Sequence, residues 1–277
     1  MSTPRFQALV LDLDGTLVTD QGSIRPRTLE RLHALHERGV RVMIATGRSE
    51  LGTLPVLGEL SMDTPAVVYN GAGLFCPVQK RLLEERLLSD RVVRRAFEFA
   101  VSSGLLPVIQ LAGAKYAPEP REEEQRHALR GLEGLCTVPF DELPRERVIR
   151  ITFFSGRHAG SEELADEVGR AIDQPLHVTH FPLKALATHR DSTLLVADVQ
   201  PPSRGKGEAL RVLEERYGIQ SERVVAVGDA DNDLPMLEQA GLAVAMENSM
   251  PRVLACADRV IGSNNSDTLA ELVDELF

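Results

Sequence analysis

Residues 6–16 read Phe-Gln-Ala-Leu-Val-Leu-Asp-Leu-Asp-Gly-Thr, an apolar run that closes on two aspartates. The apolar part is typical of a buried strand, and we predict one over residues 6–13. Because side chains alternate along a strand, Asp12 and Asp14 are expected on the same side of the chain, close to each other. Gly15 then permits a sharp turn that other residues resist.

Alternating strand-like and helical segments extend outward from this strand to about residue 75 and return near the end of the chain. In order, the predicted elements are a helix at 27–38, a strand at 40–45, a helix at 49–59, a strand at 65–69, a helix at 208–217, a strand at 224–227, a helix at 234–240, and strands at 243–245 and 260–261. Pro55 is expected to limit or bend the second helix. This alternation predicts an α/β fold with a doubly wound, Rossmann-like parallel sheet.

The middle of the chain has a different pattern. Helical segments at 91–100 and 162–172 alternate with isolated strands at 148–154 and 193–199. We therefore predict a core domain from residues 1–80 and 201–277, and an inserted α+β domain from residues 81–200. Both connections leave the core at the carboxyl ends of strands, so the insert is expected to act as a cap that selects the substrate.

Polar residues stand where the predicted core strands end. Asp12 and Asp14 close the first strand, Thr46 follows the second, Asn70 the third, and Asp229 a late one. In open α/β sheets the carboxyl ends of the strands form the ligand-binding crevice. Four strands are thus expected to deliver polar side chains to one site.

Clustered carboxylates repel one another, and a third from Asp229 or Asp233 beside Asp12 and Asp14 would add to the repulsion. A hard divalent cation relieves it. Because the available ligands are oxygens, without Cys or His, we expect Mg²⁺ rather than Zn²⁺.

A phosphate-binding arrangement is expected nearby. Thr46 and Gly47 offer a hydroxyl and an unhindered backbone N–H, and Lys206 stands between two glycines at a helix start. The chain holds only four lysines, and the compact ammonium of Lys206 suits a point-charge role. Thr46 is also a common helix N-cap, which remains the alternative.

Composition excludes several classes of protein. The 277 residues carry 41 acidic and 31 basic side chains, a net charge of −10, so we expect no nucleic-acid partner. The three cysteines form no Cys-x-x-Cys pair, which favours a reducing cytoplasm. We found no signal-peptide core and no apolar run long enough to span a membrane, and we expect a cytoplasmic monomer or small homo-oligomer.

Four motifs in order resemble those of the haloacid dehalogenase superfamily of phosphotransferases, and their spacing resembles its Cof-like, type IIB branch, which carries an inserted α/β cap. The motifs are Asp12-Leu13-Asp14-Gly15-Thr16, Thr46-Gly47-Arg48, Lys206-Gly207 and Gly228-Asp229-Ala230-Asp231-Asn232-Asp233. Asn70-Gly71 is similar to that branch's Asn-Gly turn. The resemblance covers essentially the whole core and is weakest in the insert.

The resemblance implies roles for these residues. Asp12 is the nucleophile and Asp14 the general acid and base. Thr46, Gly47, Lys206 and Asn232 bind phosphate. The implied Mg²⁺ ligands are Asp12, Asp229 and the backbone carbonyl of Asp14. Asp233 belongs to the same metal site and is implied to orient the groups around it. Arg48, Asn70 and Gly71 are candidate substrate contacts, although Arg48 also fits a surface ion pair and Asn70-Gly71 an ordinary turn.

The function these features favour is a Mg²⁺-dependent phosphatase of small phosphorylated metabolites, either sugar phosphates or a phosphorylated cofactor, acting through an aspartyl phosphate. The alternatives are a phosphomutase, a receiver-like regulatory protein that binds a phosphoryl group without turnover, and a silent binding protein. His177 and His180 are not expected to bind a metal, because a spacing of three places them on opposite faces of a strand.

Overall fold

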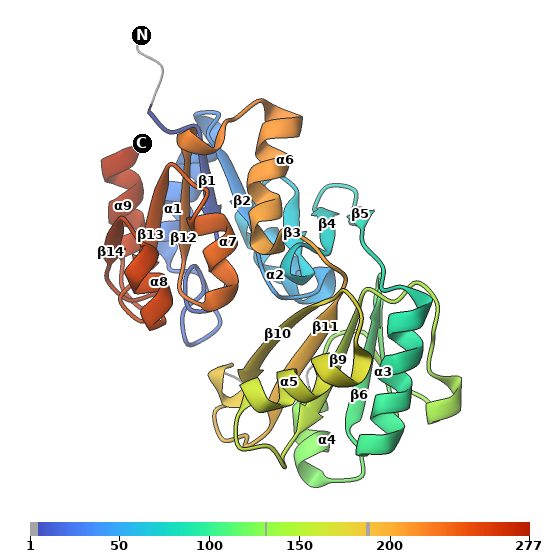
Figure 1. The fold of residues 1–277 in the computed structure, drawn as a ribbon. Coiled ribbons are helices and arrows are strands. Elements are labelled where there is room, and N and C mark those ends of the chain that lie inside the picture. Colours follow the sequence, from blue (N-terminus) through green and yellow to red (C-terminus); the bar gives the residue numbers. More distant parts are fainter. Residues whose placement is uncertain (1–4, 131, 187–188) are drawn as a thin grey trace. The chain divides into compact units, whose positions relative to one another are not determined.

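The chain folds into two compact units in a computed structural model that describes residues 5–130, 132–186 and 189–277 (Figure 1). The first unit contains the chain up to Glu84 and from Arg204 onward, and the second runs from Glu85 to Ser203. The chain thus leaves the first unit and later returns to it.

The first unit contains most of the alternating segments predicted from the sequence. Its elements are β1 (Ala8–Leu11), α1 (Pro26–Glu37), β2 (Arg41–Ile44), α2 (Glu50–Leu60), β3 (Ala66–Val68), β4 (Gly73–Cys76), β5 (Arg81–Glu85), α6 (Glu208–Tyr217), β12 (Val224–Gly228), α7 (Leu234–Leu237), β13 (Leu242–Met246), α8 (Pro251–Cys256), β14 (Arg259–Ile261) and α9 (Thr268–Leu276).

A five-stranded parallel sheet forms the centre of this unit, in the order β14-β13-β12-β1-β2. All four residues of β1 are buried, which explains why the strand is apolar throughout rather than alternating. On one face of this sheet, apolar side chains of the strands pack with those of α6, α7 and α8 in one core cluster. The α/β fold with a parallel sheet is confirmed.

The strand predicted at 65–69 is present as β3 (Ala66–Val68), and it has neighbours in two sheets. β3 belongs to a separate three-stranded sheet, β3-β4-β5, and pairs antiparallel with β4. Its link to the parallel sheet is a single bridge between Ala45 and Val67. The turn Tyr69–Gly71 reverses the chain, so β3 has a parallel contact with the strand before it and an antiparallel partner, β4, after it.

Local signals explain most helix boundaries. Pro26 occupies the first turn of α1, and Gly39, with φ of +82°, follows its end. The Ser49 hydroxyl accepts a hydrogen bond from the Gly52 N–H and so caps α2. Pro55 does not limit α2, which continues through it to Leu60.

The second unit is built on a six-stranded mixed sheet in the order β10-β11-β9-β6-β7-β8. Figure 1 shows α3 and α5 on the same face of this sheet, where their apolar sides form one core cluster. The elements are α3 (Asp90–Ser103), β6 (Leu106–Leu111), β7 (Ala114–Ala117), α4 (Glu123–Leu129), β8 (Leu135–Thr137), β9 (Arg150–Ser155), α5 (Ser161–Ile172), β10 (His177–Pro182) and β11 (Leu195–Gln200).

No described helix, in either unit, combines the length and the apolar character that a membrane crossing requires.

Candidate active site

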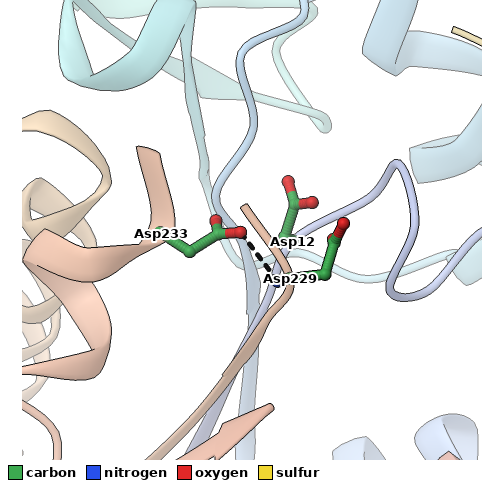
Figure 2. Close-up of side chains that lie close together, drawn as sticks. All are labelled: Asp12, Asp229 and Asp233. Atoms are coloured by element: carbon green, nitrogen blue, oxygen red, sulfur yellow. Dashed lines mark hydrogen bonds between the residues drawn. The ribbon is translucent and has the colours of Figure 1, made fainter. Parts of the chain in front are cut away.

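Three carboxyl groups meet beyond the carboxyl ends of two adjacent strands, β1 and β12. Asp12 directly follows β1, Asp229 directly follows β12, and Asp233 ends the short turn that comes next. Figure 2 shows their side chains gathered at this edge, and one oxygen of each lies within 4.8 Å of the others. Asp12 and Asp233 are buried.

Glycines leave the room for this convergence. Gly15 has φ of +85°, and a Cβ at that position would lie 2.4 Å from Oδ2 of Asp229. A Cβ at Gly228 would lie 2.5 Å from Cγ of Asp233. Real Cβ atoms do not approach other atoms so closely, so larger residues at either position would push the carboxylates apart.

Lys206 lies among the carboxylates. Its Nζ donates to Oδ1 of Asp12 and to Oδ1 of Asp233, both at 2.6 Å, and its side chain is 2% exposed. Lys206 belongs to the turn Gly205–Gly207, which immediately precedes α6. Gly71 packs against this turn, because a Cβ on it would lie 2.2 Å from the Gly205 carbonyl oxygen.

Asp233 and its neighbour Asn232 connect the loops of the site. Oδ2 of Asp233 accepts hydrogen bonds from the backbone N–H groups of Asp229 and Ala230, both at 2.9 Å. Asn232 Nδ2 donates to Oδ1 of Asn70 at 3.0 Å. Asn70 has φ of +49°, a left-handed conformation that Asn tolerates better than most residues.

Thr46 follows β2 and is buried. Its Oγ1 accepts a hydrogen bond from the Arg48 N–H at 3.1 Å, and its carbonyl accepts one from the Asn70 N–H at 3.0 Å. Thr46 is therefore not the helix N-cap, a role that Ser49 fills. A Cβ at Gly47 would lie 3.0 Å from Oδ1 of Asn70, so this turn is closely packed.

The side chain of Asp14 does not belong to this group of three carboxylates. Asp14 is exposed and forms a two-armed ion pair with Arg48, with Nε–Oδ2 and Nη2–Oδ1 distances of 2.8 and 2.5 Å. The guanidinium fork offers this carboxylate two hydrogen bonds, whereas the carboxylate cluster would repel it.

Comparison with known proteins decides the family. The model of the haloacid dehalogenase-like hydrolases matches residues 9–273. The chain belongs to the haloacid dehalogenase-like hydrolases. Pyridoxal phosphate phosphatase YbhA of Escherichia coli is 29% identical, over 96% of this chain and 97% of its own.

Solved structures agree with this assignment. A haloacid dehalogenase-like hydrolase from Bacteroides thetaiotaomicron superposes with a TM-score of 0.81, at 26% identity and over 98% of this chain and all of its own. A sugar phosphatase of subclass IIB shares the fold, with a TM-score of 0.79 at 24% identity, over 97% of this chain and 98% of that one. The predictions of membership of the haloacid dehalogenase superfamily and of a phosphoric monoester hydrolase are confirmed.

Burial and neighbouring charges shift the pKa values of three groups in this haloacid dehalogenase-like site. Burial, together with the neighbouring Asp233 carboxylate, raises the pKa of Asp229 to about 7, although the Thr16 hydrogen bond opposes the rise. Burial also holds the pKa of Asp12 well above its usual range, against the opposing effect of Lys206. Burial lowers the pKa of Lys206, but Asp12 and Asp233 outweigh it and leave that pKa raised.

Two further residues support the site of this hydrolase, and sequence reasoning gave them no role. Thr16 Oγ1 donates to Oδ1 of Asp229 at 2.8 Å, and Asn248 Nδ2 donates to the Gly15 carbonyl at 2.9 Å. Thr16 could have been found from its place in the first motif. Asn248 lies far along the chain and carries no local signal.

Two other expectations concern residues outside the site. His177 and His180 lie on β10, where His177 is half-buried and His180 exposed, and neither belongs to a group of potential metal ligands among the described residues. Cys76, Cys136 and Cys256 are free thiols.

Proposed function

We propose that this chain is a Mg²⁺-dependent phosphatase of small phosphorylated metabolites and that Asp12 is its nucleophile. One observation carries the proposal: the Asp12 carboxylate accepts a hydrogen bond from the buried ammonium of Lys206 and also belongs to the group of three carboxylates that could hold a cation. A nucleophilic carboxylate needs cationic partners on both sides to approach a phosphate dianion, and this arrangement can supply them.

The donor set fits Mg²⁺. Three carboxylates contribute oxygen atoms at close range, and burial holds the pKa values of Asp12 and Asp229 above their usual range. Buried carboxylates that ionise only at a cost gain most from a hard cation. Asp12 and Asp229 would hold it with the Asp14 carbonyl, Asp233 would support it, and the cation would neutralise charge on the phosphoryl oxygens.

The residues of the chain then divide the work of two displacements. In the first, an Asp12 oxygen bonds to phosphorus, the bond from phosphorus to the ester oxygen breaks, and Asp14 gives that oxygen its proton. In the second, Asp14 takes a proton from a water molecule while the oxygen of that water attacks phosphorus. The bond between Asp12 and phosphorus then breaks, which releases inorganic phosphate and restores the Asp12 carboxylate.

Four further groups would bind the phosphoryl group during both steps. Thr46, with the Gly47 N–H, and Lys206 would hold its oxygens, while Asn232, held by its hydrogen bond to Asn70, would orient the phosphate. Asn70 and Gly71 lie in the turn after β3 and are the proposed contacts to the rest of the substrate. Positioning and charge neutralisation dominate phosphoryl transfer, so fixed groups of this kind are what the reaction requires.

The relatives support a proposal for the substrate class. One acts on pyridoxal phosphate and another is a sugar phosphatase, so we propose phosphorylated cofactors and hexose phosphates as the compounds to test first. We further propose that the second unit, Glu85–Ser203, is the cap that chooses among them. Replacing it with a Gly/Ser linker should leave slow hydrolysis of p-nitrophenyl phosphate and remove discrimination among metabolites.

A panel of phosphomonoesters assayed with Mg²⁺ and with EDTA tests the proposed function. Phosphate release that needs Mg²⁺ and is strongest for one or a few small metabolites is expected. Transfer of the phosphoryl group between positions of a sugar, without release, would favour the phosphomutase alternative. A stable phosphorylated protein without turnover would favour the receiver-like alternative.

A further inference from the structure

Arg48 fixes both the position and the orientation of the Asp14 carboxylate. Its Nε and Nη2 donate to different oxygens of the same carboxylate, at 2.8 and 2.5 Å. A planar guanidinium that engages both oxygens restricts rotation of the carboxylate, which a single hydrogen bond does not. The orientation of Asp14 therefore depends on Arg48.

Arg48 is itself anchored in the turn that follows β2. Its N–H donates to Thr46 Oγ1 at 3.1 Å, and its carbonyl accepts from the Tyr69 N–H at 2.9 Å. Its Nη1 also donates to the Gly52 carbonyl at 3.2 Å, so the guanidinium is held from α2 as well. Arg48 thus ties Asp14 to the proposed phosphate-binding turn.

The position of Asp14 matters because of its neighbour two residues earlier. Asp12 belongs to the group of carboxylates that fits a cation, and the Asp14 carboxylate does not. An exposed carboxylate so near this group would be drawn to a bound cation as a further ligand. There it could not deliver a proton to a leaving group.

We propose that Arg48 is the positioning residue of the general acid and base, Asp14, and not a substrate contact. It holds the Asp14 carboxylate beside the cation site instead of within it, in the orientation that proton transfer needs. This inference rests on the proposed function, since it assigns Arg48 a part in the same reaction.

The leaving group provides the test. An alkyl phosphate needs a proton from Asp14, and p-nitrophenyl phosphate hardly does, so loss of positioning should affect the two esters unequally. In Arg48→Gln we expect kcat for an alkyl phosphate to fall about 10- to 100-fold, as small misplacements do, with a smaller change in KM and in p-nitrophenyl phosphate turnover. Arg48→Lys, which lacks the fork, should restore only part of the loss.

A double-mutant comparison separates positioning from binding. Because Arg48 acts through Asp14, the double variant Arg48→Gln, Asp14→Asn should be no slower than Asp14→Asn alone. Arg259→Gln is the matched control: Arg259 makes a two-armed, exposed ion pair with Glu275, away from this site, and its loss should leave both esters unchanged. If kcat falls equally for the two esters, and this fall adds to that of Asp14→Asn, Arg48 is a substrate contact. If the kinetics of Arg48→Gln are unchanged, Arg48 is only a surface ion-pair partner. Either result overturns the proposal.

Crystal structures of the wild type and of Arg48→Gln with Mg²⁺ give a readout that does not depend on turnover. The Asp14 carboxylate should leave its wild-type position in the variant. If it stays there, Arg48 does not position it, whatever the activity. A wild type that releases phosphate from no ester counts instead against the proposed function.

Discussion

The ammonium of Lys206 and the carboxylate of Asp12 form an ion pair of 2.6 Å in which both side chains are buried. Lys206 reaches Asp233 at the same distance, so one cation serves two carboxylates, and Asp229 belongs to the same group of carboxylates. The site thus holds three acidic groups and one ammonium group. A bound cation would allow all three acidic groups to ionise.

Asp12→Asn should remove turnover and leave the fold intact. The substitution deletes the nucleophile and a cation ligand but keeps the shape of the side chain, and it removes a carboxylate whose ionised form burial disfavours. Without Mg²⁺ the variant should therefore be at least as stable as the wild type in a urea titration. Phosphatase activity at the wild-type level would exclude Asp12 as the nucleophile.

Mg²⁺ should raise the melting temperature of the wild type, because it binds the folded carboxylate cluster only. A hundredfold excess over its Kd corresponds to about 2.7 kcal/mol of stabilisation. Asp229→Ala should lose this response in a thermal melt. Asp63→Ala, which removes an exposed carboxylate paired with Arg41, should keep it, and a full response in both variants would show that the cation binds elsewhere.

Much of this site could be predicted because the fold places the ends of its strands at one edge. Asp12, Thr46 and Asp229 each follow a buried parallel strand, and Lys206 lies between two glycines in the turn before α6. These are local patterns, so one sequence reveals them. The parallel sheet was predictable for the same reason, and so were α1, which ends just before Gly39, and α6, which ends just before Gly218.

The pairing of side chains could not be read from local patterns. The ion pair of Asp14 with Arg48 joins residues 34 positions apart, and the hydrogen bond of Thr16 with Asp229 joins residues 213 apart. Competition between partners of similar chemistry decides such contacts. In the same way β3 forms a hairpin with β4, a choice that its apolar sequence does not reveal.

The stability of the metal-free chain should fall as the pH rises from about 4 to 7. The pKa of Asp229 is raised from 3.8 to about 7 in the folded chain, so in this interval the folded chain holds a proton that the unfolded chain has lost. Unfolding then releases a proton, and the free energy of unfolding decreases with pH. Urea titrations in EDTA measure the slope, which Asp229→Asn should reduce, and an unchanged slope in that variant would contradict this assignment.

Gly71→Ala should impair both stability and activity. Gly71 has φ of +92°, and a Cβ on it would lie 2.2 Å from the Gly205 carbonyl, so the turn that carries Lys206 must move. Gly39→Ala is the matched control, because Gly39 has φ of +82° and open space around it. The control should lose about 1–2 kcal/mol of stability through backbone strain alone and keep its turnover. Equal effects on phosphate release in the two variants would show that Gly71 has no specific role in positioning the turn that carries Lys206.

Chemical trapping of a phosphorylated Asp12 would show whether this residue is the nucleophile. An acyl phosphate is reduced by borohydride to an alcohol, so acid-quenched enzyme, taken during turnover and then reduced and digested, should yield a peptide with homoserine at position 12. The label should need both Mg²⁺ and substrate and be absent from Asp12→Asn. Rapid phosphate release with unmodified aspartate at position 12, under conditions where a reference acyl phosphate is reduced, would contradict the account.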